Sequence, residues 1–380
     1  MNHRKLLLVC ALASASACAQ HGQRAAQITH LSEVAPPVSE RDEAELHALA
    51  DDVRDGKFGN THALLVARRG ELVYEAYFTG DERNWGEDWT RGVTFGPDRL
   101  HDARSITKTV VSSLVGIALH QGHIASIDAP LSELLPEHRH LLTGQKADLT
   151  LRHLLTMTAG FAWNEDGPRA ENDELRMYAS SDPVAYVLER DVTSEPGKRW
   201  TYSGGTTHLL GVILERSTGK PLEEYVREVL FQPLGIERFE WRGDFGGMPA
   251  PASGLRLLPR DFLKLGTLFA SGGLWSGRQI IPSAWLEQAM GPQVEIALAP
   301  NALPSARRSA YGFQWWYDEY DVAGDRVRIS GASGLGGQRI FVLPERDLVV
   351  VVLSGHFGRP GATWIPEQIL HRVLEAAPRQ

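Results

Sequence analysis

The chain has 380 residues, of which 43% are hydrophobic, 23% charged and 8% aromatic, with 37 Gly and 21 Pro. These proportions are those of an ordinary globular protein, and they exclude disordered, collagen-like and disulfide-scaffold chains. The formal net charge is −8 and no basic stripe runs along the sequence, so no nucleic acid is expected as a partner.

The first 17 residues have the order of a secretory signal peptide. Arg4 and Lys5 precede an apolar run, residues 6–17, that ends in small residues. The run is shorter than the roughly 20 residues that a membrane-spanning helix needs. The alternative is a buried N-terminal helix. The order of charged, apolar and small residues favours secretion to the periplasm, with removal of residues 1–17.

Cys18 allows a second way in which the signal peptide could be processed. The sequence Ala-Ser-Ala-Cys at 15–18 fits ordinary cleavage after Ala17 and also resembles a bacterial lipoprotein box, in which Cys18 would carry a lipid anchor. Cys10 and Cys18 are the two cysteines of the sequence, so the chain after Cys18 has no thiol and no disulfide. Residues 18–40 are polar and irregular and are expected to form a tether before a folded domain at 41–376.

Hydrophobic periodicity predicts the elements of this domain in order. The first ones are a helix at 41–53, a hairpin at 63–78 that turns at Arg69-Gly70, and a loop at 79–99. Residues 105–120 are apolar nearly all round, which is typical of a buried helix. Further helices are predicted at 151–157, 182–189, 206–217, 222–231 and 259–271. The last elements are strands at 311–317, 325–330, 338–343 and 348–353, then a helix at 366–374.

Strands at both ends of the domain, with helices between them, favour an α/β (α+β) fold. The strands are expected to form one antiparallel sheet, from about 60–80 and 310–355, flanked by the N- and C-terminal helices. An all-helical lobe would be inserted at about 105–290.

Ser105 and Lys108 are the strongest candidates for chemistry. They begin the buried helix and lie one turn apart on the same face. Burial disfavours the ammonium form of a lysine, so Lys108 could accept a proton near neutral pH and activate the Ser105 hydroxyl. The free N–H groups and the dipole at the helix N-terminus favour an anionic intermediate. Ser-x-x-Lys recurs by chance, and the alternative is a capping serine with a surface lysine.

Other site motifs are missing from the sequence. It has no G-x-S-x-G, no H-E-x-x-H and no phosphate-binding loop. The best metal candidates are His138, His140 and His153, but histidines spaced in this way on a polar loop are usually solvated, so neither a metal nor an organic cofactor is expected. Tryptophans such as Trp163 could line a pocket or fill the core.

The segment 101–165 resembles the serine β-lactamase-like superfamily, the class C and penicillin-binding group of serine hydrolases. Its matching runs are ARSITK at 103–108, GIA at 116–118, GHI at 122–124, IDAP at 127–130, LLP at 134–136 and LRHLLTMTAGF at 151–161. Later matches follow in the family's order. WTYSG at 200–204 matches the family's second motif, which is Tyr-x-Asn. PLGI at 233–236 and RDFLKLG at 260–266 match further landmarks. GASGLGGQ at 331–338 stands in the place of the third motif, which is Lys/His-Thr/Ser-Gly.

The resemblance implies roles for particular residues. Ser105 would be the acylated nucleophile, Lys108 its base, and Tyr202 the second proton-transfer group, since a phenol near a lysine and a serine can accept or give a proton. The backbone N–H groups of Ser105 and Leu335 would form the oxyanion hole. Further substrate-binding candidates are Ser203, Gly204, Ser333, Gly334 and Trp163.

Two departures from the family pattern bear on the substrate. Gly204 stands where the family has Asn, and Ala332 stands where it has the Lys or His that grips a carboxylate. Arg260 or Arg339 could supply this cation instead. The pattern looks closer to 6-aminohexanoate-dimer hydrolases and family esterases, which implies a small-molecule ester or linear amide as substrate. The alternatives are a weak β-lactamase or D-alanyl peptidase, or a catalytically silent envelope protein that binds peptidoglycan or a partner.

Overall fold

The computed structural model describes residues 40–166, 170–243, 247–300, 302–358 and 364–376. The predicted signal peptide, Cys18 and nearly all of the predicted tether lie outside these residues. Within the described part of the chain, no helix has both the length and the apolar character needed to cross a lipid bilayer.

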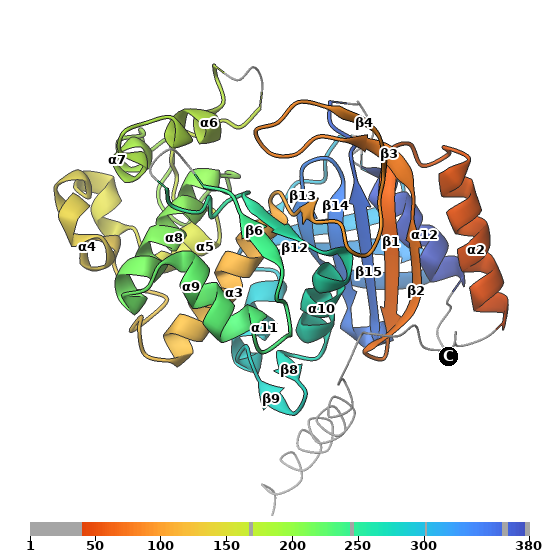
Figure 1. Ribbon diagram of the computed structural model, residues 1–380. Coiled ribbons are helices and arrows are strands. Elements are labelled where there is room, and N and C mark those ends of the chain that lie inside the picture. Colours follow the sequence, from red (N-terminus) through yellow and green to blue (C-terminus); the bar gives the residue numbers. More distant parts are fainter. Residues whose placement is uncertain (1–39, 167–169, 244–246, 301, 359–363, 377–380) are drawn as a thin grey trace, which may run out of the picture.

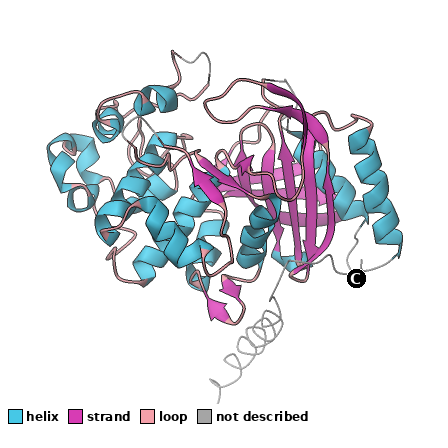
Figure 2. Ribbon diagram, in the orientation of Figure 1, coloured by secondary structure: helices cyan, strands magenta, loops and turns pink. Residues whose placement is uncertain are grey.

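An eight-stranded antiparallel sheet forms one side of the molecule (Figures 1 and 2), with the strand order β10-β11-β12-β13-β14-β15-β1-β2. The predicted hairpin is present: β1 (Thr61–Arg68) pairs with β2 (Glu71–Tyr77) across Arg69 and Gly70, whose φ values of 53° and 80° suit a tight turn. The other strands are β10 (Val294–Ile296), β11 (Ala306–Tyr311), β12 (Trp316–Val322), β13 (Asp325–Gly334), β14 (Gln338–Leu343) and β15 (Leu348–Ser354).

Strands from the two ends of the domain meet at the centre of this sheet. β15 is buried along its whole length and pairs with β1 on one side and β14 on the other. Helices α2 (Glu40–Arg54) and α12 (Ile365–Ala376) cover one face, as the amphipathic patterns at 41–53 and 366–374 predicted. The prediction of a single sheet that joins both ends is confirmed.

The opposite face of the sheet packs against the inserted segment. Helix α10 (Pro259–Ala270) lies directly on β14 and β15, and a Cβ at Gly266 would lie 2.5 Å from Cγ1 of Val349. Glycine therefore allows the helix to approach the sheet closely. Helix α3 (Ile106–His120) runs between the sheet and the remaining helices (Figure 1), and residues 106–118 are all buried.

The remaining helices form the lobe around α3. They are α4 (Leu131–Leu134), α5 (Leu151–Leu155), α6 (Asp173–Tyr178), α7 (Pro183–Leu188), α8 (Gly204–Thr218), α9 (Leu222–Val226) and α11 (Ser283–Met290). Tighter or wider helical turns occur at Pro136–Leu141, Gly144–Asp148, Arg227–Phe231 and Pro344–Arg346.

The lobe is not purely helical, so the expectation of an all-helical lobe was wrong. It contains β5 (His101–Asp102), β6 (Phe239–Trp241) and β7 (Leu255–Leu257) in a three-stranded sheet, and a pair of strands, β8 (Leu274–Trp275) and β9 (Arg278–Gln279).

Two predicted segments differ from the structure in their strands. The loop expected at 79–99 contains a strand pair, β3 (Thr79–Glu82) and β4 (Thr90–Thr94), in which the Asp81 carboxylate accepts the Gly92 N–H at 3.1 Å. The strand expected at 311–317 is two strands, since the chain turns between β11 and β12 at Gln314, whose φ is 64°.

Gln314 joins three helices of the lobe. Its Oε1 accepts the Thr207 hydroxyl at 2.7 Å, and its Nε2 donates to the Leu154 and Leu155 carbonyls at 2.9 and 3.1 Å. Its own carbonyl accepts the Thr109 hydroxyl at 3.0 Å. Buried polar groups are costly unless they are paired, so these four bonds fix α3, α5 and α8 relative to one another. The N-termini of α3 and α8 carry the candidate catalytic residues.

Candidate active site

Ser105 and Lys108 lie together at the N-terminus of α3. Ser105 is the N-cap residue and follows Arg104, whose φ is 50°. The Lys108 side chain is buried, with 1% exposure, and its Nζ donates to the Ser105 Oγ at 3.1 Å and to the Ala252 carbonyl at 2.9 Å. The lysine thus points inward toward the serine, as the one-turn spacing predicted, rather than lying on the surface.

Tyr202 reaches the same point from the N-terminus of α8. Lys108 Nζ lies 5.0 Å from the centroid of the Tyr202 ring, and the phenol lies close enough to Ser105 and Lys108 to interact with both. The ring stacks on Trp316 with a centroid distance of 6.0 Å and is flanked by Trp200 at 6.1 Å. Aromatic packing therefore orients the phenol toward the serine and the lysine.

The pKa of Lys108 is raised, whereas burial alone predicted that it would be lowered. Burial does lower it, but the deprotonated form of Tyr202 and the carboxylates of Glu174 and Glu165 act in the opposite direction and outweigh burial. The pKa of Tyr202 is also raised, because burial and the two glutamates outweigh the nearby Lys108 ammonium. The two carboxylates thus favour the protonated forms of both groups.

The end of β13 lies against the segment that precedes Ser105. A Cβ at Gly334 would come within 2.4 Å of the Ala103 carbonyl oxygen, so this position requires glycine. The exposed Leu335 follows in the turn. The buried Gln338 holds that turn, because its Nε2 donates to the Leu335 carbonyl at 3.2 Å and to the Ser354 carbonyl at 2.6 Å. The backbone at Leu335 is thus fixed on the Ser105 side of the sheet.

The other candidates for substrate binding have varied surroundings. Ser203 is buried and its Oγ accepts the Thr206 N–H at 3.3 Å, so it caps α8. Ser333 is partly exposed on β13 and pairs with Arg339 of β14. Trp163 donates its indole N–H to the Glu165 carboxylate at 2.7 Å and packs against Gly205.

Gly204 opens space that two glutamates occupy. Its N–H donates to the Glu165 carboxylate, and a Cβ at this position would lie 3.1 Å from Glu165 Oε1 and 3.0 Å from Glu174 Cδ. Sequence reasoning did not single out either glutamate. The one sequence feature that could have indicated them is Gly204, because a glycine in place of the family's Asn leaves room for other side chains.

The cation missing at Ala332 is not supplied by the two arginines considered from the sequence. Ala332 is fully buried. Arg260 binds the Glu75 carboxylate of β2, with its Nε at 2.9 Å. Arg339 binds Glu367 of α12 at 2.9 Å. Both guanidinium groups are therefore engaged by carboxylates away from Ser105.

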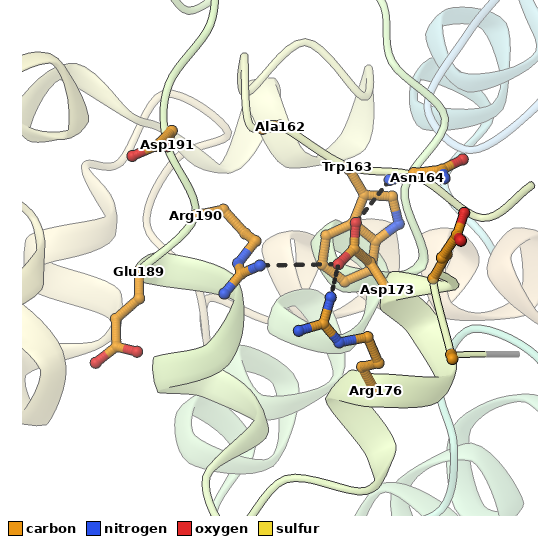
Figure 3. A pocket seen from close by; sticks show the side chains of 10 residues that line it. Ala162, Trp163, Asn164, Asp173, Arg176, Glu189, Arg190 and Asp191 are labelled. Atoms are coloured by element: carbon orange, nitrogen blue, oxygen red, sulfur yellow. Dashed lines mark hydrogen bonds and ion pairs between the residues drawn. The ribbon is translucent and has the colours of Figure 1, made fainter.

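A separate pocket of about 470 Å³ lies beside Trp163, between the loop that follows α5 and helices α6 and α7 (Figure 3). Asp173 accepts the Asn164 N–H there at 2.8 Å and pairs with Arg190 at 3.8 Å and Arg176 at 4.0 Å. Ser105, Lys108 and Tyr202 are not among the residues that line this pocket.

The histidines considered as metal ligands have local structural contacts. His138 pairs with Asp182 at 3.3 Å, and His153 accepts the Thr150 N–H at 3.1 Å at the start of α5. Within the described ranges, no three His, Cys, Asp or Glu side chains are grouped so that they could hold a metal ion.

Comparisons with known proteins identify hydrolases among the relatives of this chain. The 6-aminohexanoate-dimer hydrolase of Paenarthrobacter ureafaciens is 26% identical over 307 residues, which cover 77% of this chain and 72% of that protein. Esterase EstB of Burkholderia gladioli is 31% identical over 216 residues, 53% of each protein, so the match spans about half of EstB.

Solved structures share the fold. The octameric penicillin-binding protein homologue from Pyrococcus abyssi matches with a TM-score of 0.63 at 19% identity, over 87% of this chain and 76% of that one. The family model described as "Beta-lactamase" matches residues 54–370, which is most of the sequence. By the extent of that match, the protein belongs to the beta-lactamase family, whose relatives named above are hydrolases.

Proposed function

We propose that the protein is a serine hydrolase that cleaves esters or small linear amides through an acyl-enzyme on Ser105. The observation that carries this proposal is the convergence of Ser105, Lys108 and Tyr202 from the N-termini of α3 and α8, with Lys108 Nζ 3.1 Å from Ser105 Oγ. Relatives named as an amide-dimer hydrolase and an esterase support the reaction class.

Acylation begins with attack of Ser105 Oγ on the substrate carbonyl carbon. Lys108 accepts the hydroxyl proton, which requires that the Lys108–Tyr202 couple has first lost one proton. The backbone N–H groups of Ser105 and Leu335 bind the oxyanion that forms. Tyr202 then protonates the leaving alcohol or amine as its bond to the carbonyl carbon breaks, and it regains a proton from Lys108.

Deacylation repeats these steps with water. The couple removes a proton from water as its oxygen attacks the acyl carbon, and the proton returns to Ser105 Oγ as the acid leaves. The whole cycle consumes one water and requires no redox partner.

We expect a neutral p-nitrophenyl ester to be hydrolysed with a kcat/KM at least about tenfold higher than a chromogenic cephalosporin, or about 1.4 kcal/mol. A β-lactam carries a carboxylate that is costly to bury without a cation, and neither Ala332 nor the engaged Arg260 and Arg339 provides one. Both substrates are measured on one enzyme preparation. Equal or faster cephalosporin hydrolysis would favour the β-lactamase alternative.

We also propose that the protein is exported to the periplasm, either released after Ala17 or anchored through a lipid on Cys18. The charged and apolar order of residues 1–17 supports export. We expect the intact mass of the purified protein to lack residues 1–17, with added acyl mass if Cys18 is lipidated, and a lipidated form to be in the membrane fraction. A cytoplasmic protein that retains Met1 to Ala17 would contradict both forms.

A further inference from the structure

Two glutamates converge beside the catalytic residues without being part of the family's motifs. Glu165 lies in the loop after α5 and Glu174 lies on α6, and both border the space above Gly204. Glu165 accepts N–H groups from Gly204 and, at 2.7 Å, from Trp163. Its carboxylate is thereby fixed against the first turn of α8, two residues after Tyr202.

Glu174 is connected to Lys108 through a neighbouring segment. Its Oε1 accepts the Ser253 hydroxyl at 2.9 Å, and the carbonyl of the adjacent Ala252 accepts the Lys108 Nζ at 2.9 Å. One short piece of backbone therefore places the Glu174 carboxylate and the Lys108 ammonium near each other. Both glutamates are half-buried, so solvent screens their charges less than on an open surface.

Several charged or titratable groups face this pair. They are Lys108 on α3, Arg104 just before α3, Tyr202 just before α8, Tyr178 on α6 and Tyr311 on β11. Burial and the proximity of Glu174 raise the pKa of Glu165 to about 7, against the opposing effect of Lys108. The Arg104 guanidinium also forms an ion pair with Asp102, at 3.3 Å. Lys108 is therefore the cation of the reaction on whose proton Glu165 and Glu174 act.

We propose that Glu165 and Glu174 are positioning residues of the reaction, which hold Lys108 and Tyr202 in their protonated forms and so set the pH at which Ser105 is acylated. The inference rests on the proposed function. It follows from the placement of two carboxylates against one ammonium and one phenol, since a nearby negative charge favours the protonated form of both.

Removal of a glutamate charge should shift the pH profile of kcat/KM toward lower pH. Acylation requires the Lys108–Tyr202 couple to lose one proton, so kcat/KM falls on the acid side of the pH profile. Removing one carboxylate charge weakens the hold on that proton. The couple then loses it at a lower pH, and the acid limb moves in the acid direction.

The test is the pH profile of kcat/KM for a neutral p-nitrophenyl ester, followed at the isosbestic wavelength of p-nitrophenol. Glu165→Gln and Glu174→Gln keep the shape of the side chain and remove its charge. We expect each to shift the acid limb to lower pH by about 1 unit. Because Glu165 also binds Gly204 and Trp163, Glu174→Gln is the informative variant if Glu165→Gln fails to fold.

Two variants from the same region serve as controls. Glu171→Gln removes an exposed charge next to α6. Asp173→Asn breaks the ion pairs that Asp173 of α6 makes with Arg176 and, beyond α7, with Arg190. Neither should move the limb, although Asp173→Asn should lower the thermal midpoint. If both glutamate variants keep the wild-type limb, or if the controls shift it equally, the proposal is wrong.

An inactive but folded glutamate variant is assessed by the pH dependence of fluorophosphonate labelling at Ser105. Labelling that shifts to lower pH supports the proposal, and labelling that is lost at every pH overturns it. Failure of the proposed function has a different signature, because turnover would then persist in Ser105→Ala.

Discussion

Ser105→Ala is expected to reduce ester turnover by at least about 10⁴-fold while leaving the fold intact. The hydroxyl is the nucleophile of the proposed reaction, and the Thr107 hydroxyl on the same turn is engaged with the Arg104 carbonyl at 2.6 Å. As N-cap of α3, Ser105 makes no side-chain capping bond, so its truncation costs the helix little. Lys108 keeps its bond to the Ala252 carbonyl. The measurement is kcat/KM of the purified variant, with its thermal unfolding compared to wild type.

Fluorophosphonate labelling supplies the control for Ser105→Ala. The wild type should be labelled at Ser105 and the variant should not. This result also separates an enzyme from a silent binding protein, since a binding protein would be labelled in neither form. Near-normal turnover of the variant would show that Ser105 is not the nucleophile.

Lys108→Ala should lose acylation by roughly 10²- to 10⁴-fold, and Lys108→Arg should not restore it. Arginine keeps its proton at any accessible pH and cannot accept one from Ser105. The raised pKa of Lys108 does not remove this distinction, because a lysine can still release its proton in the reactive fraction of the enzyme whereas an arginine cannot. The readout is the acyl-enzyme burst with a p-nitrophenyl ester.

Lys108→Arg is the more informative of the two variants because it keeps a cation beside Glu165 and Glu174. Lys108→Ala leaves Glu165 and Glu174 without the Lys108 ammonium, so its activity is compared only after its unfolding curve is known. If Lys108→Arg forms the acyl-enzyme as fast as the wild type, Lys108 has a structural role and Tyr202 alone would have to act as the base.

Local sequence patterns predicted those parts of the molecule that local forces determine. The all-round apolar helix at 105–120, the Arg69-Gly70 turn and the buried strand β15 follow from periodicity and turn chemistry. The turn at Gln314 could not be predicted in this way, because its partners lie far away in the sequence. The strand pair at 79–94 is local, but its Gly- and Asp-rich sequence lacks the alternation that marks a strand.

The residues of the candidate site likewise include some that have a local sequence signal and some that have none. Ser105 and Lys108 are neighbours on one helical turn, and the resemblance supplied Tyr202. Glu165 and Glu174 have no local signal, since they meet only where Gly204 leaves space. For that reason the direction of the Lys108 pKa shift could not be inferred from burial, because Tyr202 and the two carboxylates, which raise this pKa, come from other elements.

The pairing of β1 with β15 has a consequence for how the protein folds. Thr61 pairs with Ser354 and Arg68 with Leu348, so the central contact of the sheet joins segments separated by most of the chain. Contacts of such long sequence separation slow folding, because a long loop must close before they form. Until β15 arrives, the β1–β2 hairpin presents an unpaired edge, which is prone to association with other chains. Ribosomal synthesis must therefore reach residue 354 before the sheet can close, and until then the chain is incompletely folded and open to binding by chaperones.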